Sequence, residues 1–492
     1  MPGYPRPRTV PPLPLGELAV LLGARRAGDV GVTGVTVASD TVRPGDLFAA
    51  LPGSRAHGAR FIGAARAAGA VAVLTDAAGA AAAEGLPTLV VDDPRAAVGE
   101  VAAVVYGRPT ERLTVLGVTG TAGKTSTAYL IESGLRAAGA PTALIGTVET
   151  RIGDEVLDSV RTTPEASDLQ ALFAVALERG VAALAMEVSS HALALGRVNG
   201  TRFAVGGYTN FGTDHLDFHA SVDEYFAAKA LLFDGRCRDE VLNLDDPALK
   251  PLLKRRTITY SAAGDPAATW RASDITADGY GQRFRAVGPA TVDMTVALPG
   301  RHNVANALLA LASLVAVGVD AETAAAGIAA CPGVPGRLER VTAPGPVVGV
   351  VDYAHKPDAI VAALAALREA TTGRLICVIG AGGDRDKGKR PVMGAAAANG
   401  ADLVIVTDDN PRTEDPAAIR AEVRRGAGRT AIEVDGRRAA IGEAVARAEP
   451  GDVIALLGKG HERGQEVGGE VYPFDDRVEL ADALTRRFGS GS

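Results

Sequence analysis

The sequence predicts an α/β protein of three domains, with a central doubly wound sheet and a C-terminal Rossmann-like sheet. Three observations predict this fold. Apolar runs of strand length alternate with alanine-rich stretches of helix length along most of the chain. One such run leads directly into the glycine-rich segment "GVTGTAGKTS" at residues 117–126. At 492 residues, the chain is also too long to fold around one hydrophobic core.

Two breaks in this pattern divide the chain. "YGRPTERL" at residues 106–113 and "CPGVPGRLERV" at residues 331–341 combine glycine, proline and charge between apolar segments. We therefore predict an N-terminal domain of residues 1–108, a central domain of residues 109–334 and a C-terminal domain of residues 335–492.

Each predicted domain contains short apolar runs that are typical of buried parallel strands. Alanine-rich stretches near Ala80 and Ala325 favour helices between them. Because each run ends in polar or glycine-rich residues, we expect ligands at the carboxyl ends of the strands. The runs are "VAVLT" and "TLVVDD" in the first domain, "TVLGVTG", "PTALIGTV", "VAALAMEV" and "FAVGGYTNF" in the second, and "PVVGVVDYAH", "LICVIGAGG", "DLVIVTDD" and "DVIALLGKG" in the third.

Composition excludes several classes of protein. Hydrophobic residues make up 47% and charged residues 22%, as in ordinary soluble proteins, and the net charge of −7 argues against a nucleic-acid partner. The three cysteines lie far apart without metal-ligand spacing, which is typical of free thiols in a reducing compartment. The opening "MPGYPRPRTVPPLPL" lacks the apolar core of a signal peptide, and no apolar run reaches about 18 residues. We expect a cytoplasmic protein without a membrane span.

The glycine-rich segment departs from the common phosphate-loop spacing, because Val118 stands where the first glycine is expected. It fits a shorter form, Gly-Thr-x-Gly-Lys-[Ser/Thr]. Glycines after a strand let backbone N–H groups converge on phosphate oxygens, and the start of the next helix favours negative charge. Lys124 would reach the outer phosphates of a nucleotide, and the Thr125 hydroxyl would bind Mg²⁺. A glycine-rich turn without a ligand is the alternative.

Ten further motifs occur in order along the chain. They are "TTPE", "MEVSSHAL", "NFGTDHLDFH", "YFAAKALLF", "LPGRHNVANALLA", "GRLERV", "VVDYAHKPDA", "GGDRDKGKRP", "DDNPRTEDP" and "GKGHERGQEV". Together they resemble the Mur ligases, and most closely the members that add diaminopimelate as the third residue of the peptidoglycan stem peptide. The resemblance extends from about residue 35 to residue 475.

The resemblance implies an ADP-forming amide ligase of peptidoglycan synthesis, and so a role in cell wall biogenesis, cell shape, the cell cycle and cell division. In such a reaction ATP phosphorylates the D-glutamate carboxylate of UDP-N-acetylmuramoyl-L-alanyl-D-glutamate. The amine of diaminopimelate then displaces the phosphate. The small-molecule partners are thus ATP, the UDP-muramoyl dipeptide and diaminopimelate, and we expect the enzyme to act as a monomer.

The same resemblance implies a magnesium site and the catalytic residues. The catalytic residues are Lys124, Glu187, His215 and Lys229, and the metal ligands are Thr125, Glu187, His215 and Lys229. Lys229 would bind the metal as a carbamate formed with CO₂, which requires the uncharged amine that burial favours. Read without the motifs, Glu187 also suits an arginine partner, His215 a structural role and Lys229 a solvated helix face.

The ATP site implied by the resemblance draws on the central and C-terminal segments. Asn303 would bond the adenine, Arg337 the phosphates and Asp352 a ribose hydroxyl, with His355 and Lys356 close by. Each of these also suits a helix cap, a surface charge or a turn. Since Arg337 and Asp352 belong to another predicted domain than the glycine loop, closure of the two domains would complete the site. The full set is Gly120, Thr121, Ala122, Gly123, Lys124, Thr125, Ser126, Asn303, Arg337 and Asp352.

The UDP-muramoyl dipeptide would bind between the first two domains. Two departures from the family pattern leave parts of that site open: Leu195 stands where related enzymes often carry glutamine, and "SDT" replaces the usual Ser-Arg. Arg197 suits a carboxylate or phosphate. The expected contacts are Val37, Ser39, Ser54, Arg55, Ala56, Thr162, Thr163, Ser189 and Arg197.

Selectivity for the amine is expected in "DDNPRTEDP" and two further loops of the C-terminal domain. Diaminopimelate carries a distal carboxylate beside its ammonium, and Arg385 and Arg412 would grip that carboxylate, while Gly458 and Glu462 would receive the ammonium. With lysine bound, both arginines would lack a partner, which a polar site can reject by about 10⁴-fold. An Asn-Pro turn is the simpler alternative. The implied contacts are Arg385, Asp409, Asn410, Pro411, Arg412, Gly458 and Glu462.

Two other functions remain open from the sequence. One is a related ligase that adds lysine, another amino acid or a dipeptide, or that extends folate with glutamate. The other is a nucleotide-binding scaffold without ligase activity. Neither the meso nor the LL form of diaminopimelate is favoured by the motif.

Overall fold

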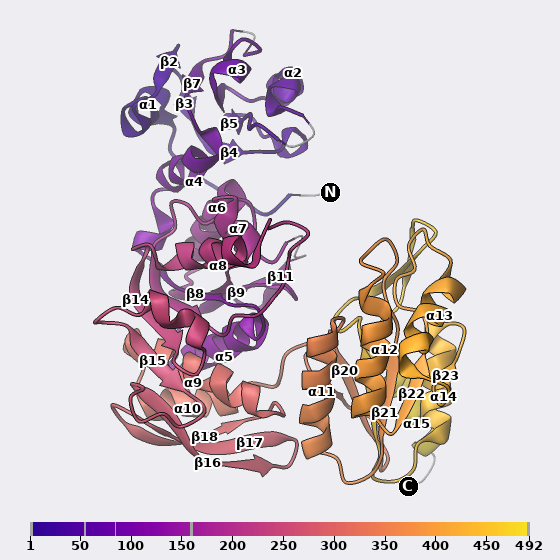
Figure 1. Ribbon diagram of the computed structural model, residues 1–492. Helices are drawn as coiled ribbons and strands as arrows, with labels where there is room; N and C mark the ends of the chain where they lie inside the picture. The colour runs from indigo at the N-terminus through magenta and orange to yellow at the C-terminus, as the bar shows by residue number, and fades with distance from the viewer. Residues whose placement is uncertain (1–2, 54–55, 84, 158–160, 490–492) are drawn as a thin grey trace. The chain divides into compact units, whose positions relative to one another are not determined.

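The computed structural model describes residues 3–53, 56–83, 85–157 and 161–489 (Figure 1). The chain divides into two compact units. One comprises Met1–Arg271, Val287–Val292 and Ala305–Ile328, and the other Ala272–Ala286, Asp293–Val304 and Ala329–Ser492. The predicted mixture of parallel sheets and helices is confirmed, while the exact bounds of the three domains stay a prediction.

The first hundred residues form a sheet of order β2-β7-β6-β5-β4. Its strands are parallel except for β2, which runs antiparallel to β7. The strands are β2 (Arg25–Ala27), β4 (Gly34–Thr36), β5 (Asp46–Ala49), β6 (Ala72–Thr75) and β7 (Thr88–Val90), with the short pair β1 (Leu13–Pro14) and β3 (Gly31–Val32) beside them. The helical segments are α1 (Leu15–Leu22), η1 (Ser39–Thr41), η2 (Gly58–Phe61), α2 (Ile62–Ala67), α3 (Ala77–Ala80) and α4 (Pro94–Val105).

The central sheet has the order β11-β10-β9-β12-β8-β13-β14-β15-β16-β17-β18. Six strands that are neighbours in the order β9-β12-β8-β13-β14-β15 pair in parallel. The continuous apolar runs predicted four of them, β8, β9, β12 and β13, but not β14 and β15. The strands are β8 (Thr114–Thr119), β9 (Thr142–Ile145), β10 (Thr150–Ile152), β11 (Glu155–Leu157), β12 (Ala183–Glu187), β13 (Phe203–Tyr208), β14 (Cys237–Asn243), β15 (Ile258–Ser261), β16 (Trp270–Asp278), β17 (Gly281–Val287) and β18 (Thr291–Val296).

Helices follow these strands as a doubly wound sheet requires. Leu169, Leu172 and Phe173 of one helix are buried with residues of β8, β9 and β12 in a single core. The helical segments are η3 (Pro109–Glu111), α5 (Lys124–Ala137), α6 (Ala166–Glu178), α7 (Ser190–Ala194), α8 (Val222–Ala230), η4 (Leu231–Phe233), η5 (Pro247–Leu252), α9 (Arg301–Ala316) and α10 (Ala321–Ala329). The antiparallel strands β10 and β11 and the extension from β16 to β18 were not predicted, because their short or alternating segments lack the long apolar runs of the central strands.

The C-terminal sheet has the order β19-β20-β24-β21-β22-β23, and its strands from β20 to β23 are parallel. Alternate residues of β21 face different cores: Cys377 packs with helices α11 to α13, and Ile376 packs with α14 and α15 (Figure 1). Both faces are therefore covered, which confirms the Rossmann-like prediction. The strands are β19 (Glu339–Val341), β20 (Val348–Asp352), β21 (Leu375–Ile379), β22 (Leu403–Val406), β23 (Ile432–Glu433) and β24 (Val453–Leu457), with the hairpin β25 (Gly464–Val467) and β26 (Glu470–Pro473). The helices are α11 (Pro357–Glu369), α12 (Lys389–Gly400), α13 (Pro416–Ala427), α14 (Arg437–Arg447) and α15 (Asp476–Phe488).

In the described part of the chain, no helix combines the length and the apolar character that crossing a membrane demands. The thiols of Cys237, Cys331 and Cys377 are all buried.

Candidate active site

The glycine loop joins β8 to α5, as the sequence predicted. Gly120 and Gly123 have positive φ angles of 142° and 83°, where a side chain would be strained. A Cβ at Gly120 would also collide with the Thr209 hydroxyl, and one at Gly123 with the Asn306 amide oxygen. The loop therefore lies against neighbouring backbone and side chains in a shape that only glycine permits at these two positions.

Two lysine side chains meet at this loop. Lys124 Nζ donates to the Gly120 carbonyl at 2.7 Å and to the Thr121 carbonyl at 3.0 Å. Lys229 Nζ, from α8, donates to the same Gly120 carbonyl at 2.8 Å and lies 4.6 Å from the centre of the Tyr225 ring. Lys229 is only 1% exposed, which rules out the solvated helix face considered from the sequence. Two ammonium groups thus share one acceptor at the site where phosphate is expected.

Glu187 ends β12 beside β8 and is 1% exposed. Its Oε2 accepts a hydrogen bond from the Thr125 hydroxyl at 3.0 Å and one from the Thr147 hydroxyl at 3.1 Å, and its Oε1 accepts one from the Thr147 N–H at 2.7 Å. A Cβ at Gly146 would lie 2.6 Å from Oε1. Hydroxyl donors, rather than the arginine considered as an alternative, hold this carboxylate next to the predicted Mg²⁺-binding threonine.

His215 lies in a cluster of aromatic rings. Its ring centre is 4.7 Å from that of His191 and 6.1 Å from that of Tyr225, and its Nε2 is 3.4 Å from Asp214 Oδ2. Its backbone has a φ of 52°, an uncommon conformation for a residue other than glycine. Tyr225 in turn hydrogen-bonds Thr121 at 3.2 Å, so this tyrosine connects the histidine cluster with the glycine loop.

The oxygens of Thr125 and Glu187 are the hard ligands that Mg²⁺ prefers, and so these residues fit a magnesium ion that also binds phosphate. An ammonium at Lys229 does not fit a metal, whereas a carbamate would add two oxygens. Among the described residues, no cluster of three or more His, Cys, Asp and Glu side chains could hold a metal by itself.

The predicted ATP contacts outside the loop are already engaged within the protein. Asn303 is 3% exposed and donates to the Pro299 carbonyl at 2.8 Å. The two carboxylate oxygens of Asp352 accept the N–H groups of Leu338 and Ala354, each at 2.7 Å, and burial raises the pKa of this carboxyl although Arg337 opposes the change. The Arg337 guanidinium carbon lies 4.9 Å from the centre of the Tyr353 ring.

His355 and His461 lie near these C-terminal contacts. Burial lowers the pKa of each imidazole to about 4, and His355 also hydrogen-bonds the Tyr353 carbonyl. Both rings are therefore uncharged at neutral pH. Lys356 follows His355 at the N-cap of α11.

The central-domain residues predicted for the dipeptide gather around Glu187. The Thr163 hydroxyl donates to the Glu187 carbonyl at 2.9 Å and accepts the Ser189 N–H at 3.2 Å, and Thr162 hydrogen-bonds Thr147. Arg197 pairs with Glu165, with 3.0 Å between Nε and Oε1. The structure thus brings Thr162, Thr163, Ser189 and Arg197 to the carboxyl end of β12, as predicted parallel strands require.

The first-domain contacts are less closely grouped. Val37 and Ser39 follow β4, and Ser39 opens η1. Ala56 is half-buried in the loop after β5, while Ser54 and Arg55 lie outside the described residues.

The residues predicted for diaminopimelate occupy three loops at the carboxyl edge of the C-terminal sheet. Asn410, after β22, donates to Glu462 Oε2 at 2.8 Å and accepts from Lys459 Nζ at 3.0 Å. Lys459 is fully buried and also lies 3.2 Å from Glu462. A Cβ at Gly458 would collide with the Asp409 carboxylate. Hydrogen bonds and an ion pair between side chains of the quoted motifs therefore connect the loops after β22 and β24.

Arg385 and Arg412 differ in their surroundings although they lie close together. A Cβ at Gly382 would be 3.0 Å from Arg412 Nη1 and 3.9 Å from Arg385 Cγ. Arg412 donates to the Gly383 carbonyl at 2.7 Å and to Glu466 at 3.1 Å, and hydrogen bonds of its own backbone to Glu466 and Gly468 hold it at a φ of 54°. Arg385 is exposed, and no described residue forms an ion pair or hydrogen bond with its guanidinium. Pro411 is buried against the loop of Arg385, since its carbonyl faces Gly383.

Sequence reasoning missed the residues that hold the predicted ones in place. Asn210, in "NFGTDHLDFH", accepts the Ala122 N–H at 3.0 Å, and Asn306, one turn after Asn303 on α9, lies against Gly123. Proximity to the quoted motifs was the one available signal for them. The others are Thr147, Glu165, Tyr225, Lys459 and Glu466, whose partners are distant in sequence.

Comparisons with known proteins match the chain to one family. Three family models match the chain: the Mur ligase family, catalytic domain, over residues 31–106; the Mur ligase middle domain over residues 118–314; and the Mur ligase, glutamate ligase domain, over residues 336–460. The chain is 53% identical to the UDP-N-acetylmuramoyl-L-alanyl-D-glutamate--2,6-diaminopimelate ligase of Streptomyces coelicolor, with 99% of each chain covered.

Two further relatives agree. The protein of the same name from Corynebacterium glutamicum is 46% identical, with 95% of this chain and 94% of that protein covered. A solved structure of a UDP-N-acetylmuramoyl-L-alanyl-D-glutamate--2,6-diaminopimelate ligase matches with a TM-score of 0.69 and 32% identity, covering 93% of this chain and 95% of that one. With its three matching domain models and its full-length relatives, the chain belongs to the Mur ligase family.

Proposed function

We propose that this protein is the ATP-dependent ligase that joins diaminopimelate to the D-glutamate of UDP-N-acetylmuramoyl-L-alanyl-D-glutamate in peptidoglycan synthesis. The observation that carries the proposal is the convergence of Arg385, Arg412, Asn410 and Glu462 at one edge of the C-terminal sheet. Two guanidinium groups beside a carboxylate suit an amine that has both a carboxylate and an ammonium at its distal end. The relatives named above carry the same activity in their names.

The reaction proceeds in two displacements. A D-glutamate carboxylate oxygen attacks the γ-phosphorus of ATP, and the bond to the ADP oxygen breaks. The uncharged amine of diaminopimelate then attacks the acyl carbon, the C–O bond to phosphate breaks, and an amide, free phosphate and a proton result. The first step brings a carboxylate and a triphosphate together, and the second develops negative charge on the acyl oxygen and the departing phosphate. The protein must therefore supply positive charge at both places.

Lys124 provides that charge at the glycine loop. Its ammonium now donates to two loop carbonyls, and bound phosphates would offer it stronger, charged acceptors. Backbone N–H groups from Gly123 to Ser126 would bind the same phosphates at the start of α5. Asn303, Arg337 and Asp352 remain the proposed contacts for the rest of ATP.

Thr125 and Glu187 would hold Mg²⁺, which neutralises phosphate charge and polarises the γ-phosphoryl group. His215 and a carbamate at Lys229 are proposed as the further ligands. The shared Gly120 carbonyl supports the carbamate, because two ammonium groups on one acceptor repel each other and conversion of Lys229 to an anion removes that repulsion. ¹³C NMR with labelled bicarbonate would detect the carbamate, and its absence in Lys229→Ala would assign the carbon to this side chain.

The UDP-muramoyl dipeptide is proposed to bind Ser39, Ala56, Thr162, Thr163, Ser189 and Arg197. Thr163 is hydrogen-bonded to Glu187, the residue that would hold the metal, and Ser189 is hydrogen-bonded to Thr163. This arrangement would bring the D-glutamate carboxylate toward the transferred phosphate. Arg197 would exchange its ion pair with Glu165 for a substrate carboxylate or phosphate. The setting we propose is a cytoplasmic monomer whose product feeds cell wall growth, cell shape and division.

The deciding experiment measures ADP release with the UDP-muramoyl dipeptide and, separately, meso-diaminopimelate, LL-diaminopimelate and L-lysine. We expect either form of diaminopimelate to be used about 10³-fold or more better than lysine, because lysine leaves a guanidinium without its partner. Faster release with lysine would replace this function by that of a lysine-adding relative. No release with any amine, together with ATP binding, would favour the nucleotide-binding scaffold.

A further inference from the structure

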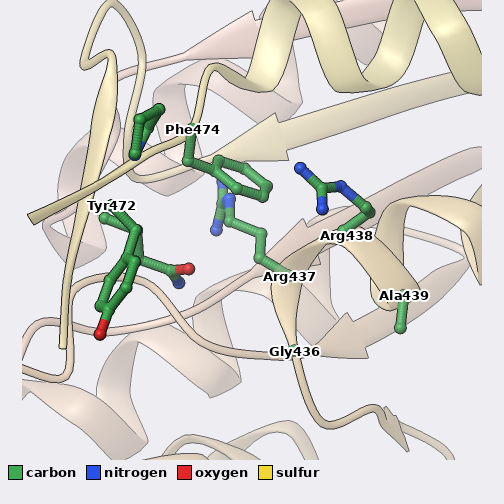
Figure 2. A pocket seen from close by; sticks show the side chains of 8 residues that line it. Gly436, Arg437, Arg438, Ala439, Tyr472 and Phe474 are labelled. Atoms are coloured by element: carbon green, nitrogen blue, oxygen red, sulfur yellow. The ribbon is translucent and has the colours of Figure 1, made fainter.

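The three loops after β21, β22 and β24 carry the residues proposed for diaminopimelate, and we call them the amino-acid loops. A fully buried ion pair lies beside two of them, those after β22 and β24. Arg437, the first residue of α14, donates from Nε to Asp476 Oδ1 at 2.7 Å and from Nη2 to Oδ2 at 2.5 Å. Asp476 is the first residue of α15, and neither side chain is exposed. Figure 2 shows the Arg437 side chain running from the start of α14 toward the Phe474 ring, at a cavity of about 590 Å³ that it lines together with Gln465.

An arginine at this place opposes local preference. Helix starts favour acidic side chains, yet Arg437 and Arg438 both occupy the first turn of α14, which contains no acidic residue. Burial lowers the pKa of Arg437, but the nearby Asp476 carboxylate raises it by more than burial lowers it. The guanidinium therefore stays charged. Such a residue is retained only where tertiary contacts offset the local cost.

The remaining donors of Arg437 bind the ends of two strands. Nη1 donates to the Asp408 carbonyl at 3.3 Å, and Nη2 donates to the Leu457 carbonyl at 3.1 Å. Asp408 follows β22 and Leu457 ends β24, and these strands lie on opposite sides of β21 in the sheet. Because β21 separates them, β22 and β24 cannot hydrogen-bond each other. The guanidinium therefore connects two strand ends that the sheet itself keeps apart.

The residue that follows each of these two carbonyls in the sequence belongs to the proposed amino-acid site. Asp409 follows Asp408 and begins the stretch through Arg412, while Gly458 follows Leu457 and begins the stretch through Glu462. Asp408 makes a second contact with the start of α14, because its Oδ2 accepts a hydrogen bond from the Gly436 N–H at 3.1 Å. A shift of Arg437 would move both loops.

We propose that Arg437, held in place by Asp476, is a positioning residue for the incoming amino acid, which sets the spacing between the loops after β22 and β24. The role rests on the proposed function of those loops. Arg437 itself touches no substrate: it acts through the carbonyls of Asp408 and Leu457. A planar guanidinium can bind a carboxylate twice and two carbonyls in addition, whereas the ammonium of a lysine cannot span this set.

The chain contains a matched control for this pair. Arg438, the next residue, pairs with Glu479 one turn further along α15, at 2.6 Å between Nη2 and Oε1. This pair connects the same two helices with the same charges, but the Arg438 side chain is 69% exposed and donates to neither strand end. Substitutions in the two pairs therefore change charge equally and differ in the contact with the loops.

The test compares Arg437→Lys and Asp476→Asn with Arg438→Lys and Glu479→Gln in the full-length enzyme. We expect the KM for the amino acid to rise about tenfold or more in the first two variants, while the KM values for ATP and the UDP-muramoyl dipeptide stay within about twofold. The control pair should leave all three KM values within about twofold. Melting temperatures of all four variants show whether a change in KM accompanies loss of the fold.

Equal rises in all three KM values would make the pair a stability element and overturn the proposal, as would an unchanged KM for the amino acid or failure of both Arg437→Lys and Asp476→Asn to fold. The kinetics are measured with whichever amine the wild type uses. A wild type that prefers lysine would thus contradict the proposed function, while the effect of Arg437 on the KM for that amine would still decide the positioning role.

Discussion

The glycine loop of the central sheet and the amino-acid loops of the C-terminal sheet both lie at the carboxyl ends of parallel strands, yet they are organised differently. At the glycine loop, Lys124, Thr125, Glu187 and Lys229 all hydrogen-bond other groups of the same site. At the amino-acid loops, Arg412 is committed to Gly383 and Glu466, but Arg385 is exposed without a protein partner in the described chain.

This difference suits the role that we propose for each site. A phosphate-transfer site gains rate when its charges are already placed and do not have to reorganise during the reaction. A site that selects one amine gains discrimination when a charged group stays unsatisfied until the right ligand arrives. We therefore expect substitutions at the glycine loop to change the rate of the reaction, and substitutions at the amino-acid loops to change which amine is used.

The largest effect is expected for Lys124→Ala. Loss of the ammonium removes one positive charge that we propose for the transferred phosphoryl group, and we expect ADP release to slow by about 10³-fold. Release of ADP in a coupled assay with all three substrates measures this. Lys250→Ala, at an exposed lysine of the same unit, serves as the control and should stay within about twofold of the wild type. Comparable activity in both variants would show that the glycine loop takes no part in the reaction.

Glu187→Gln tests the metal role of this carboxylate separately from its structural role. The amide keeps acceptor and donor atoms for Thr125 and Thr147, so the free energy of unfolding should change by about 1 kcal/mol or less. The rate should fall by about 10²-fold, and the Mg²⁺ concentration for half-maximal rate should rise, because a charged oxygen ligand is lost. A rate loss that matches loss of folded protein would show a structural role alone.

Arg385 and Arg412 provide the sharpest test of the comparison. Arg385→Ala should raise the KM for diaminopimelate about tenfold or more while changing the free energy of unfolding by no more than about 0.5 kcal/mol. Arg412→Ala should also lower that free energy by about 1–2 kcal/mol, because Gly383 and Glu466 lose a hydrogen-bonding partner. Kinetics and chemical denaturation of both variants measure the two effects. Equal loss of stability in the two variants would contradict the view that, of these two arginines, only Arg412 stabilises the fold through its hydrogen bonds.

The smallest effect concerns pH. His461 has a pKa of about 4 in the folded protein because of burial, against about 6.5 in an unfolded chain. The unfolded state therefore binds a proton first as pH falls, and the contribution of the neutral ring to stability is complete above pH 6.5 and lost progressively between pH 6.5 and 4.

Melting curves of the wild type and His461→Gln between pH 7 and pH 5 test this difference. The variant should lose about 1 kcal/mol less stability over that range than the wild type, after allowance for solvent screening. Other titrating groups affect both proteins equally. Parallel curves would show that His461 is protonated alike in the folded and unfolded states.

Much of this molecule follows from its sequence. The runs that became β8, β12, β20, β21, β22 and β24 were recognisable because strands buried on both faces need uninterrupted apolar residues. The glycine loop was recognisable because Gly120 and Gly123 need φ angles that other residues avoid. The short antiparallel strands β10 and β11 and the hairpin of β25 and β26 were not, because their pairing depends on neighbours rather than on their own composition.

The sequence by itself determined which chemical groups are present and, through strand ends and glycines, the loops on which they lie. Only the tertiary structure decided how each group is held: that Glu187 is bound by Thr125 and Thr147, that Lys124 and Lys229 share one carbonyl, and that Arg437 joins the ends of β22 and β24. The physical reason is range. Backbone preference and apolar periodicity act between neighbours along the chain, whereas a buried polar group takes its partner from whatever part of the chain the fold brings within hydrogen-bonding distance.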